Sequence, residues 1–129
     1  DFCEDVPTLS KSAVKKIVDI FEQAGALAKV SSIHVNGWFG DYDKLAMTRI
    51  FLAECFQLEM DSAQEQIVFC GDSPNDAPMF GFFENSVGVA NVLDYTEDLE
   101  QQPCWITKNR TASGFVELAE TILNAHSVS

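Results

Sequence analysis

The residues best suited to chemistry in this chain lie in one short segment, GDSPND at positions 71–76. It supplies two carboxylates, Asp72 and Asp76, with a serine and an asparagine between them. An apolar stretch at 67–70 leads directly into it, which predicts a buried strand that ends at the glycine. Ligands of open α/β sheets bind outside the carboxyl ends of the strands. Oxygen donors suit a hard cation, so the segment predicts a Mg²⁺ site with Asp72 and Asp76 as metal ligands.

Each of these side chains also has a purely structural explanation. Asp72 can accept hydrogen bonds from nearby backbone N–H groups, as aspartates in turns do. Asp76 can cap the helix that follows, and this role is compatible with metal binding. Ser73 is a candidate substrate-binding residue, although a role in the turn explains it better.

The rest of the sequence alternates between helical and extended patterns, which predicts an α/β fold with parallel strands and flanking helices. The predicted helices cover 10–24, 44–57, 76–83 and 113–124, with a helical turn at 94–101, and the predicted strands cover 28–35, 67–70, 86–89 and 104–107. Asn36 and Gly37 form a dipeptide that is typical of a tight turn.

The segment GDSPNDAPMF, together with Lys44 upstream, resembles the fourth and third motifs of the haloacid dehalogenase (HAD) superfamily. The likeness is greatest to its Cof-type, class IIB sugar phosphatases. It implies a partial HAD-like Rossmannoid core plus the tail of an α/β cap. Residues 1–40 would be the C-terminal part of the cap domain and the hinge, and 41–129 the C-terminal half of the core domain.

The resemblance also implies a function, that of a Mg²⁺-dependent phosphomonoester hydrolase acting on a small phosphorylated metabolite such as a sugar phosphate. Lys44 and Asp72 would be catalytic, and Lys44, Asn75 and Ser73 would bind the phosphate or the substrate. A lysine in the first turn of a helix works against the helix dipole, and such local conflicts are typical of functional residues.

One part of the family pattern is missing. Members carry an Asp-x-Asp pair after an N-terminal strand, in which the first Asp is the nucleophile and the second the general acid and base. The segment 41–43 has this spacing, but no apolar strand precedes it. We therefore expect the C-terminal half of such an enzyme, inactive in isolation. Without its neighbour, the strand at 67–70 would have an open edge, so we expect self-association or pairing with the missing N-terminal half.

Composition excludes several other classes. Eight basic residues against 20 acidic ones leave a net charge of −12, which disfavours nucleic-acid binding. No apolar run approaches the roughly 18 residues of a membrane span, and no basic-then-apolar leader is present at the first residues. The four cysteines form no Cys-x-x-Cys pair, which favours reduced thiols. These features predict a cytoplasmic protein with no membrane partner.

Two other functions remain open. The phosphorylation domain of a P-type ion pump has a similar Gly-Asp and Asn-Asp segment, but pumps follow it with membrane helices, and the sequence contains none. A non-catalytic binding or regulatory protein that keeps the HAD scaffold is the stronger alternative, because the nucleophile is missing.

Overall fold

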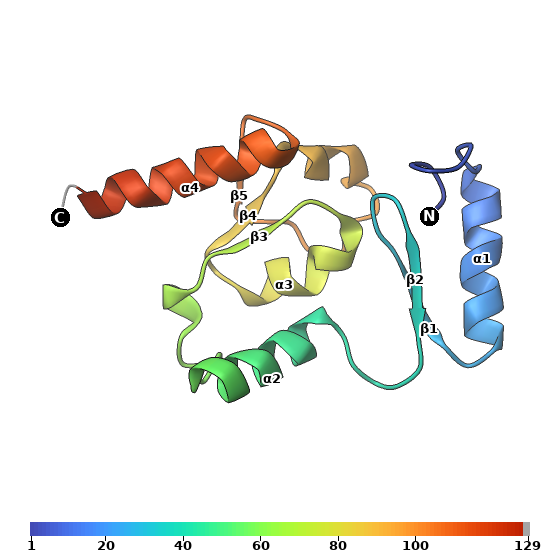
Figure 1. Ribbon diagram of the computed structural model, residues 1–129, viewed down its shortest axis with the longest axis horizontal. Coiled ribbons are helices and arrows are strands. Elements are labelled where there is room, and N and C mark those ends of the chain that lie inside the picture. Colours follow the sequence, from blue (N-terminus) through green and yellow to red (C-terminus); the bar gives the residue numbers. More distant parts are fainter. Residues whose placement is uncertain (128–129) are drawn as a thin grey trace. The chain divides into compact units, whose positions relative to one another are not determined.

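The computed structural model describes residues 1–127 of the 129-residue chain. Two compact units, Asp1–Asp43 and Lys44–Ser129, divide the chain (Figure 1). This division falls a few residues after the expected boundary between 40 and 41. The assignment of the two parts to the tail of a cap and to half of a core stays a prediction.

The first unit is a helix packed against a two-stranded hairpin. Helix α1 spans Lys11–Gln23, as the sequence predicts. Ser10 caps its start, with the Ser10 Oγ accepting a hydrogen bond of 3.3 Å from the backbone N–H of Ala13. Gly25 follows the helix with φ +78°, a conformation that glycine adopts without steric cost and that commonly ends a helix.

The hairpin consists of the antiparallel strands β1 (Leu27–Val30) and β2 (Val35–Trp38). The sequence predicts one strand over 28–35, of which only the first residues lie in β1, and the turn predicted at Asn36 and Gly37 is wrong. The turn lies between the two strands, and both residues of the expected turn lie inside β2.

A serine side chain explains the position of this turn. The backbone N–H and the hydroxyl of Ser31 both donate to the carbonyl oxygen of His34, at 2.8 and 3.2 Å. Gly37 serves a different purpose, because a Cβ at this position would lie 2.4 Å from the ring of Phe21. The glycine therefore allows α1 to approach β2 closely rather than forming a turn.

The second unit is a parallel sheet of three strands in the order β3-β4-β5, with helices on both faces (Figure 1). Its main elements are α2 (Lys44–Phe56), β3 (Phe69–Gly71), α3 (Ala77–Phe82), β4 (Ser86–Gly88), β5 (Trp105–Ile106) and α4 (Thr111–Ser127). Short 3₁₀ helices occur as η1 (Gln64–Gln66), η2 (Pro74–Asp76) and η3 (Ala90–Tyr95). The predicted α/β fold with a partial Rossmannoid core is thereby confirmed. The predicted helical turn at 94–101 is present but begins earlier, because the 3₁₀ segment η3 already starts at Ala90.

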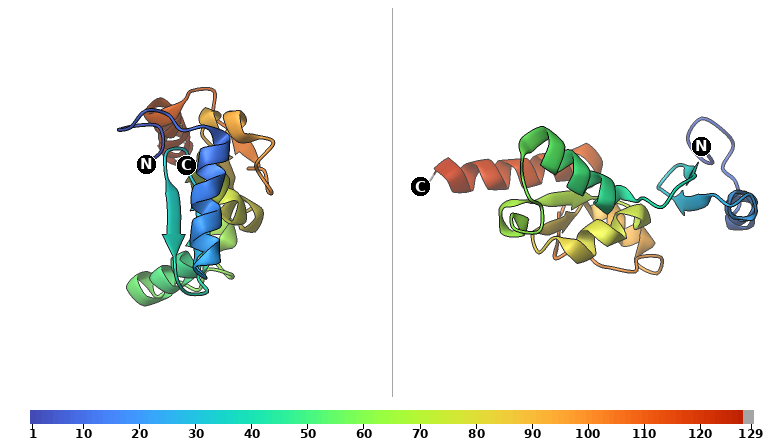
Figure 2. Two further views of the ribbon diagram at one scale, coloured as in Figure 1. Left: turned by 90° about the vertical axis from the view of Figure 1, so that its right-hand side faces the viewer. Right: turned by 90° about the horizontal axis from the view of Figure 1, so that it is seen from below.

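Alternation along the chain places neighbouring side chains on opposite faces of this sheet. Phe69 packs against two rings, with centroids 5.5 Å from Phe80 and 6.1 Å from Phe83, and α2 contributes Leu45 and Leu52 to the same core. On the other face, Val68 and residues of β4, β5 and α4 line a hollow of about 360 Å³. The last turns of α4 extend past the sheet (Figure 2).

No helix within residues 1–127 combines the length and the apolar character needed to cross a membrane.

Candidate active site

The chain turns sharply where β3 ends. Ser73 has an extended backbone, and Pro74, whose ring fixes φ near the helical value, opens the 3₁₀ turn η2. Asp76, three residues after Ser73, completes a capping box by accepting a hydrogen bond from the Ser73 N–H at 3.3 Å. This local chemistry is why the strand passes directly into a helix and leaves polar groups at the carboxyl edge of the sheet.

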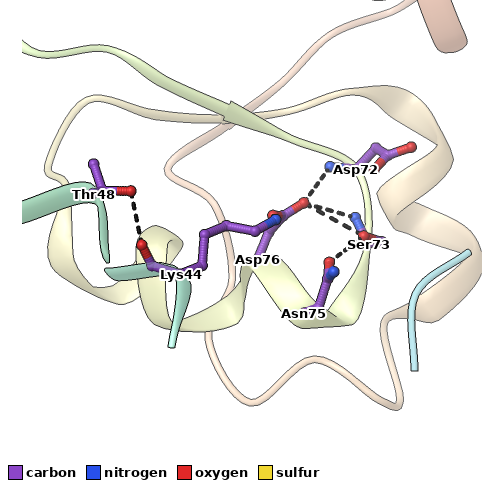
Figure 3. A network of polar contacts seen from close by, with 6 residues as sticks. All are labelled: Lys44, Thr48, Asp72, Ser73, Asn75 and Asp76. Carbon is purple, nitrogen blue, oxygen red and sulfur yellow. Dashed lines mark hydrogen bonds and ion pairs between the residues drawn. The ribbon is translucent and has the colours of Figure 1, made fainter. Parts of the chain in front are cut away.

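Asp76 is the buried centre of the site, with 4% of its surface exposed. Its Oδ2 accepts hydrogen bonds from the backbone N–H groups of Asp72, at 2.9 Å, and Ser73. Its Oδ1 pairs with the Nζ of Lys44 (Figure 3). A buried carboxylate needs such partners, because an uncompensated charge in the interior is costly. Gly71 leaves room for the carboxylate, since a Cβ there would lie 2.6 Å from Asp76 Oδ2.

Lys44, the first residue of α2, reaches this carboxylate from 32 positions away in the sequence. Its carbonyl oxygen accepts a hydrogen bond from Thr48 Oγ1 at 2.8 Å. The Lys44 side chain remains 44% exposed, so the lysine is paired with Asp76 and still partly accessible to solvent. An ammonium carries three donor hydrogens, which leaves donors for a second anion such as a phosphate.

Asp72 and Asn75 offer the groups that the network does not use. The Asp72 carboxylate points away from the Lys44–Asp76 pair (Figure 3). Asn75 Oδ1 accepts a hydrogen bond of 2.6 Å from Ser73 Oγ, which leaves the Asn75 NH₂ group without a partner among residues 1–127. Ser73 is buried, at 4% exposed, so its visible role is to orient Asn75 and Asp76. The structure thus brings all five predicted site residues together, while their roles stay predictions.

Sequence reasoning missed Asn91. This residue lies in η3, just after β4, and its Nδ2 donates to Asp72 Oδ2 at 3.4 Å. Its position in the sequence could have indicated this role. Because β4 pairs in parallel with β3, the loops that follow the two strands meet at one edge of the sheet.

The electrostatics of the site are negative. Burial raises the pKa of the Cys70 thiol, and the nearby carboxylates of Asp72 and Asp76 raise that pKa further. Burial is the larger cause, so the raised pKa of Cys70 reflects the negative charge of the two carboxylates only in part. That negative charge favours a cation beside Asp72.

The donor set can be tested against Mg²⁺. Within residues 1–127, no three or more acidic, histidine or cysteine side chains group together to hold a metal. Both oxygens of Asp76 already accept from protein donors, whereas Asp72 Oδ1 has no hydrogen-bond partner in the same part of the chain. Mg²⁺ usually takes one or two carboxylates and completes its shell with water and substrate phosphate. Asp72 fits that pattern as a single carboxylate, whereas the role of Asp76 as a metal ligand stays a prediction, because its oxygens are taken by protein donors.

Comparison with known protein families gives a match over the second unit. A family model described as sucrose-6F-phosphate phosphohydrolase matches residues 45–121, more than half of the chain, and this stretch includes β3 and the segment 71–76. No curated protein and no solved structure gives a significant match.

Proposed function

The chain belongs to the sucrose-6F-phosphate phosphohydrolase family, and thereby to the HAD superfamily, and from this premise we propose that it forms part of a Mg²⁺-dependent phosphatase. The substrate class that we propose is a small phosphorylated sugar. The narrower likeness to class IIB, Cof-type enzymes forms part of the same proposal.

One observation carries this proposal. One turn at the carboxyl end of a parallel strand carries Asp72 and Asn75, and the Lys44 ammonium reaches the same turn through its pair with the buried Asp76. Phosphoryl transfer depends mainly on positioned charges that stabilise the transferring group. A cationic donor, a neutral donor and a carboxylate whose Oδ1 has no partner among residues 1–127 supply such charges.

Each residue then has a distinct task. Lys44 and Asn75 donate hydrogen bonds to phosphoryl oxygens, and Asp76 holds Lys44 and the backbone in place. Asp72 would hold the metal ion, which when bound offsets the charge of the phosphate. Ser73 Oγ donates to Asn75 Oδ1, which leaves the Asn75 NH₂ for the phosphate. None of these residues supplies a nucleophile to the phosphorus.

The resemblance to HAD enzymes indicates the missing step. An aspartate oxygen attacks the phosphorus, the bond from phosphorus to the sugar oxygen breaks, and that oxygen takes a proton from a second aspartate. Water then hydrolyses the aspartyl-phosphate. We propose that both aspartates come from another polypeptide segment and that the 129-residue chain alone is inactive.

The edge of the sheet supports this view. β3 has a strand partner on one side, β4, and lies at the edge of the described sheet. Unpaired strand edges are templates for pairing with another strand. We propose that this edge pairs with a second chain or with an N-terminal half that carries the nucleophile.

The test uses the chain itself, titrated with Mg²⁺ and then with inorganic phosphate, with backbone amide chemical shifts as the readout. We expect a saturable response around 71–76 that Asp72→Ala abolishes for Mg²⁺, and a phosphate response that Lys44→Ala weakens. Asp98→Ala, which removes an exposed carboxylate outside the site, should leave both responses unchanged. A wild-type chain that responds to neither ion would contradict the proposal. Hydrolysis of p-nitrophenyl phosphate by the pure chain would contradict its inactivity.

A non-catalytic binding or regulatory role remains the second candidate, because the sequence has no Asp-x-Asp pair after an apolar strand. The same titration separates the two functions. A protein that keeps this segment only as scaffold would show no Mg²⁺ response that depends on Asp72.

A further inference from the structure

The side chain of Asn91 joins two segments that are distant in sequence. Its Nδ2 donates to Asp72 Oδ2 at 3.4 Å, and its Oδ1 accepts from the backbone N–H of Thr111 at 2.8 Å. A carboxylate only accepts and a backbone N–H only donates, so the amide satisfies both partners in just one orientation. The link is therefore directional, with its NH₂ toward the candidate metal ligand and its oxygen toward α4.

The α4 end of this link is conformationally unusual. Thr111, the first residue of the helix, has φ +51°, and a β-branched residue rarely adopts this left-handed conformation. Such backbone conformations persist where the surrounding structure holds them. The Glu117 carboxylate holds the preceding residues by accepting from the N–H groups of Lys108 and Asn109, at 3.1 and 3.0 Å. Asn91 holds the N–H of Thr111 itself.

The Asp72 end depends on the same amide. Among the described residues, Asn91 is the single hydrogen-bond partner of the Asp72 carboxylate. The distance exceeds the usual range of roughly 2.7–3.2 Å for a bond of this kind. Hydrogen bonds at functional sites are often long in the unliganded protein and shorten when the ligand binds.

We propose that Asn91 is a positioning residue. It orients the Asp72 carboxylate and couples this orientation to the conformation of the first turn of α4. The consequence for Mg²⁺ affinity rests on the proposed function, whereas the coupling itself is a property of the protein without metal. Partners that orient metal ligands typically change metal affinity by about 10- to 100-fold when they are removed.

The first experiment needs no metal. In the 129-residue chain, Asn91→Ala should lower the hydrogen-exchange protection of the Thr111 amide at least several-fold. Asp72→Ala should shift the side-chain NH₂ resonances of Asn91. Asn85→Ala is the matched control, because Asn85 Nδ2 also donates to a distant acceptor, the carbonyl of Glu65, at 2.9 Å. This control should leave the Thr111 amide unchanged.

The isosteric Asn91→Asp separates the two ends and guards against a variant that fails to fold. It keeps an acceptor for the Thr111 N–H and removes the donor to Asp72. We expect Thr111 protection to be retained and the carboxyl ¹³C resonance of Asp72 to shift. Unchanged Thr111 protection in Asn91→Ala, or unchanged Asn91 side-chain signals in Asp72→Ala, would overturn the coupling.

The second experiment adds Mg²⁺ alone. Asn91→Ala should raise the dissociation constant about tenfold, while Asn85→Ala leaves it unaltered. Equal affinity in wild type and Asn91→Ala would overturn the positioning role. If the wild-type chain does not bind Mg²⁺, the proposed function fails, and the metal-free measurements still decide whether Asn91 couples Asp72 to α4.

Discussion

Lys44 and Asp76 form an ion pair of unequal burial, in which the carboxylate side chain is 5% exposed and the lysine side chain 44%. Breaking a buried charge pair by removing one partner is destabilising, because the remaining group loses its compensation. The pair therefore has a structural role in addition to the proposed chemical one. The two roles can be separated by comparing the aspartates of the segment 71–76.

Asp76→Ala should destabilise the chain strongly, by about 2–4 kcal/mol in the free energy of unfolding. The substitution leaves the N–H groups of Asp72 and Ser73 and the ammonium of Lys44 without their acceptor. Asp72→Ala should change the same quantity by no more than about 0.5 kcal/mol, because its carboxylate has one long hydrogen bond. Urea unfolding followed by circular dichroism measures both. Equal losses for the two variants would contradict the division of roles.

Gly71→Ala should displace the Asp76 carboxylate. A Cβ at position 71 would lie 2.6 Å from Asp76 Oδ2, which is closer than real Cβ contacts allow. Overpacking of this kind costs roughly 1–3 kcal/mol. The amide resonances of Asp72 and Ser73 should shift as well, since they report the hydrogen bonds to that carboxylate. Gly25→Ala, at a position with free space but φ +78°, is a control that strains the backbone without touching the site.

Cys70 should react with iodoacetamide more slowly than Cys55 and Cys104 at neutral pH. Burial raises the pKa of the Cys70 thiol, with Asp72 and Asp76 raising it further, while Cys55 and Cys104 are exposed. Asp72→Asn should speed the reaction of Cys70, because it removes one of the charges that raise this pKa. Mass spectrometry of time points ranks the three sites. A Cys70 that reacts first would contradict the electrostatic description.

Stability should depend on pH through Glu117. Hydrogen bonds from the backbone N–H groups of Lys108 and Asn109 lower the pKa of Glu117 below its ordinary value of 4.5. A folded-state pKa below the unfolded one stabilises the protein above pH 4.5, and this contribution is lost as the pH falls through the folded value. The difference in urea midpoint between wild type and Glu117→Gln should therefore become smaller as the pH is lowered from 6 to roughly 3. Glu120→Gln, on the exposed side of the same helix, should show little difference at either pH.

Thr111→Gly should stabilise the chain, by up to about 1 kcal/mol, because glycine adopts φ +51° without the steric cost that threonine bears. Thr121→Gly is the matched control, since it places glycine within the same helix and should cost about 0.3 kcal/mol, the difference between the helix propensities of the two residues. Thermal unfolding gives both values. A loss of stability for Thr111→Gly would show that its side chain contributes contacts that outweigh the backbone cost.

The sequence alone determined the features that arise between near neighbours. An apolar run ending in GDSPND predicted a strand, a sharp turn and a capped helix start, and β3, η2 and α3 follow in that order. These features depend on backbone propensities and hydrogen bonds that span about four residues, which can be read directly from the sequence. The adverse position of Lys44 at the start of α2 was also visible, as a conflict with the helix dipole.

The tertiary structure decided which distant groups meet. The pairing of Lys44 with Asp76 and of Asn91 with Asp72 depends on the packing of α2 and on the parallel register of β3 and β4. The turn at Ser31 shows the same limit, because close approach to Phe21 required a glycine at position 37 inside β2. A residue type has several possible uses, and its use here depends on which segments lie against it in three dimensions.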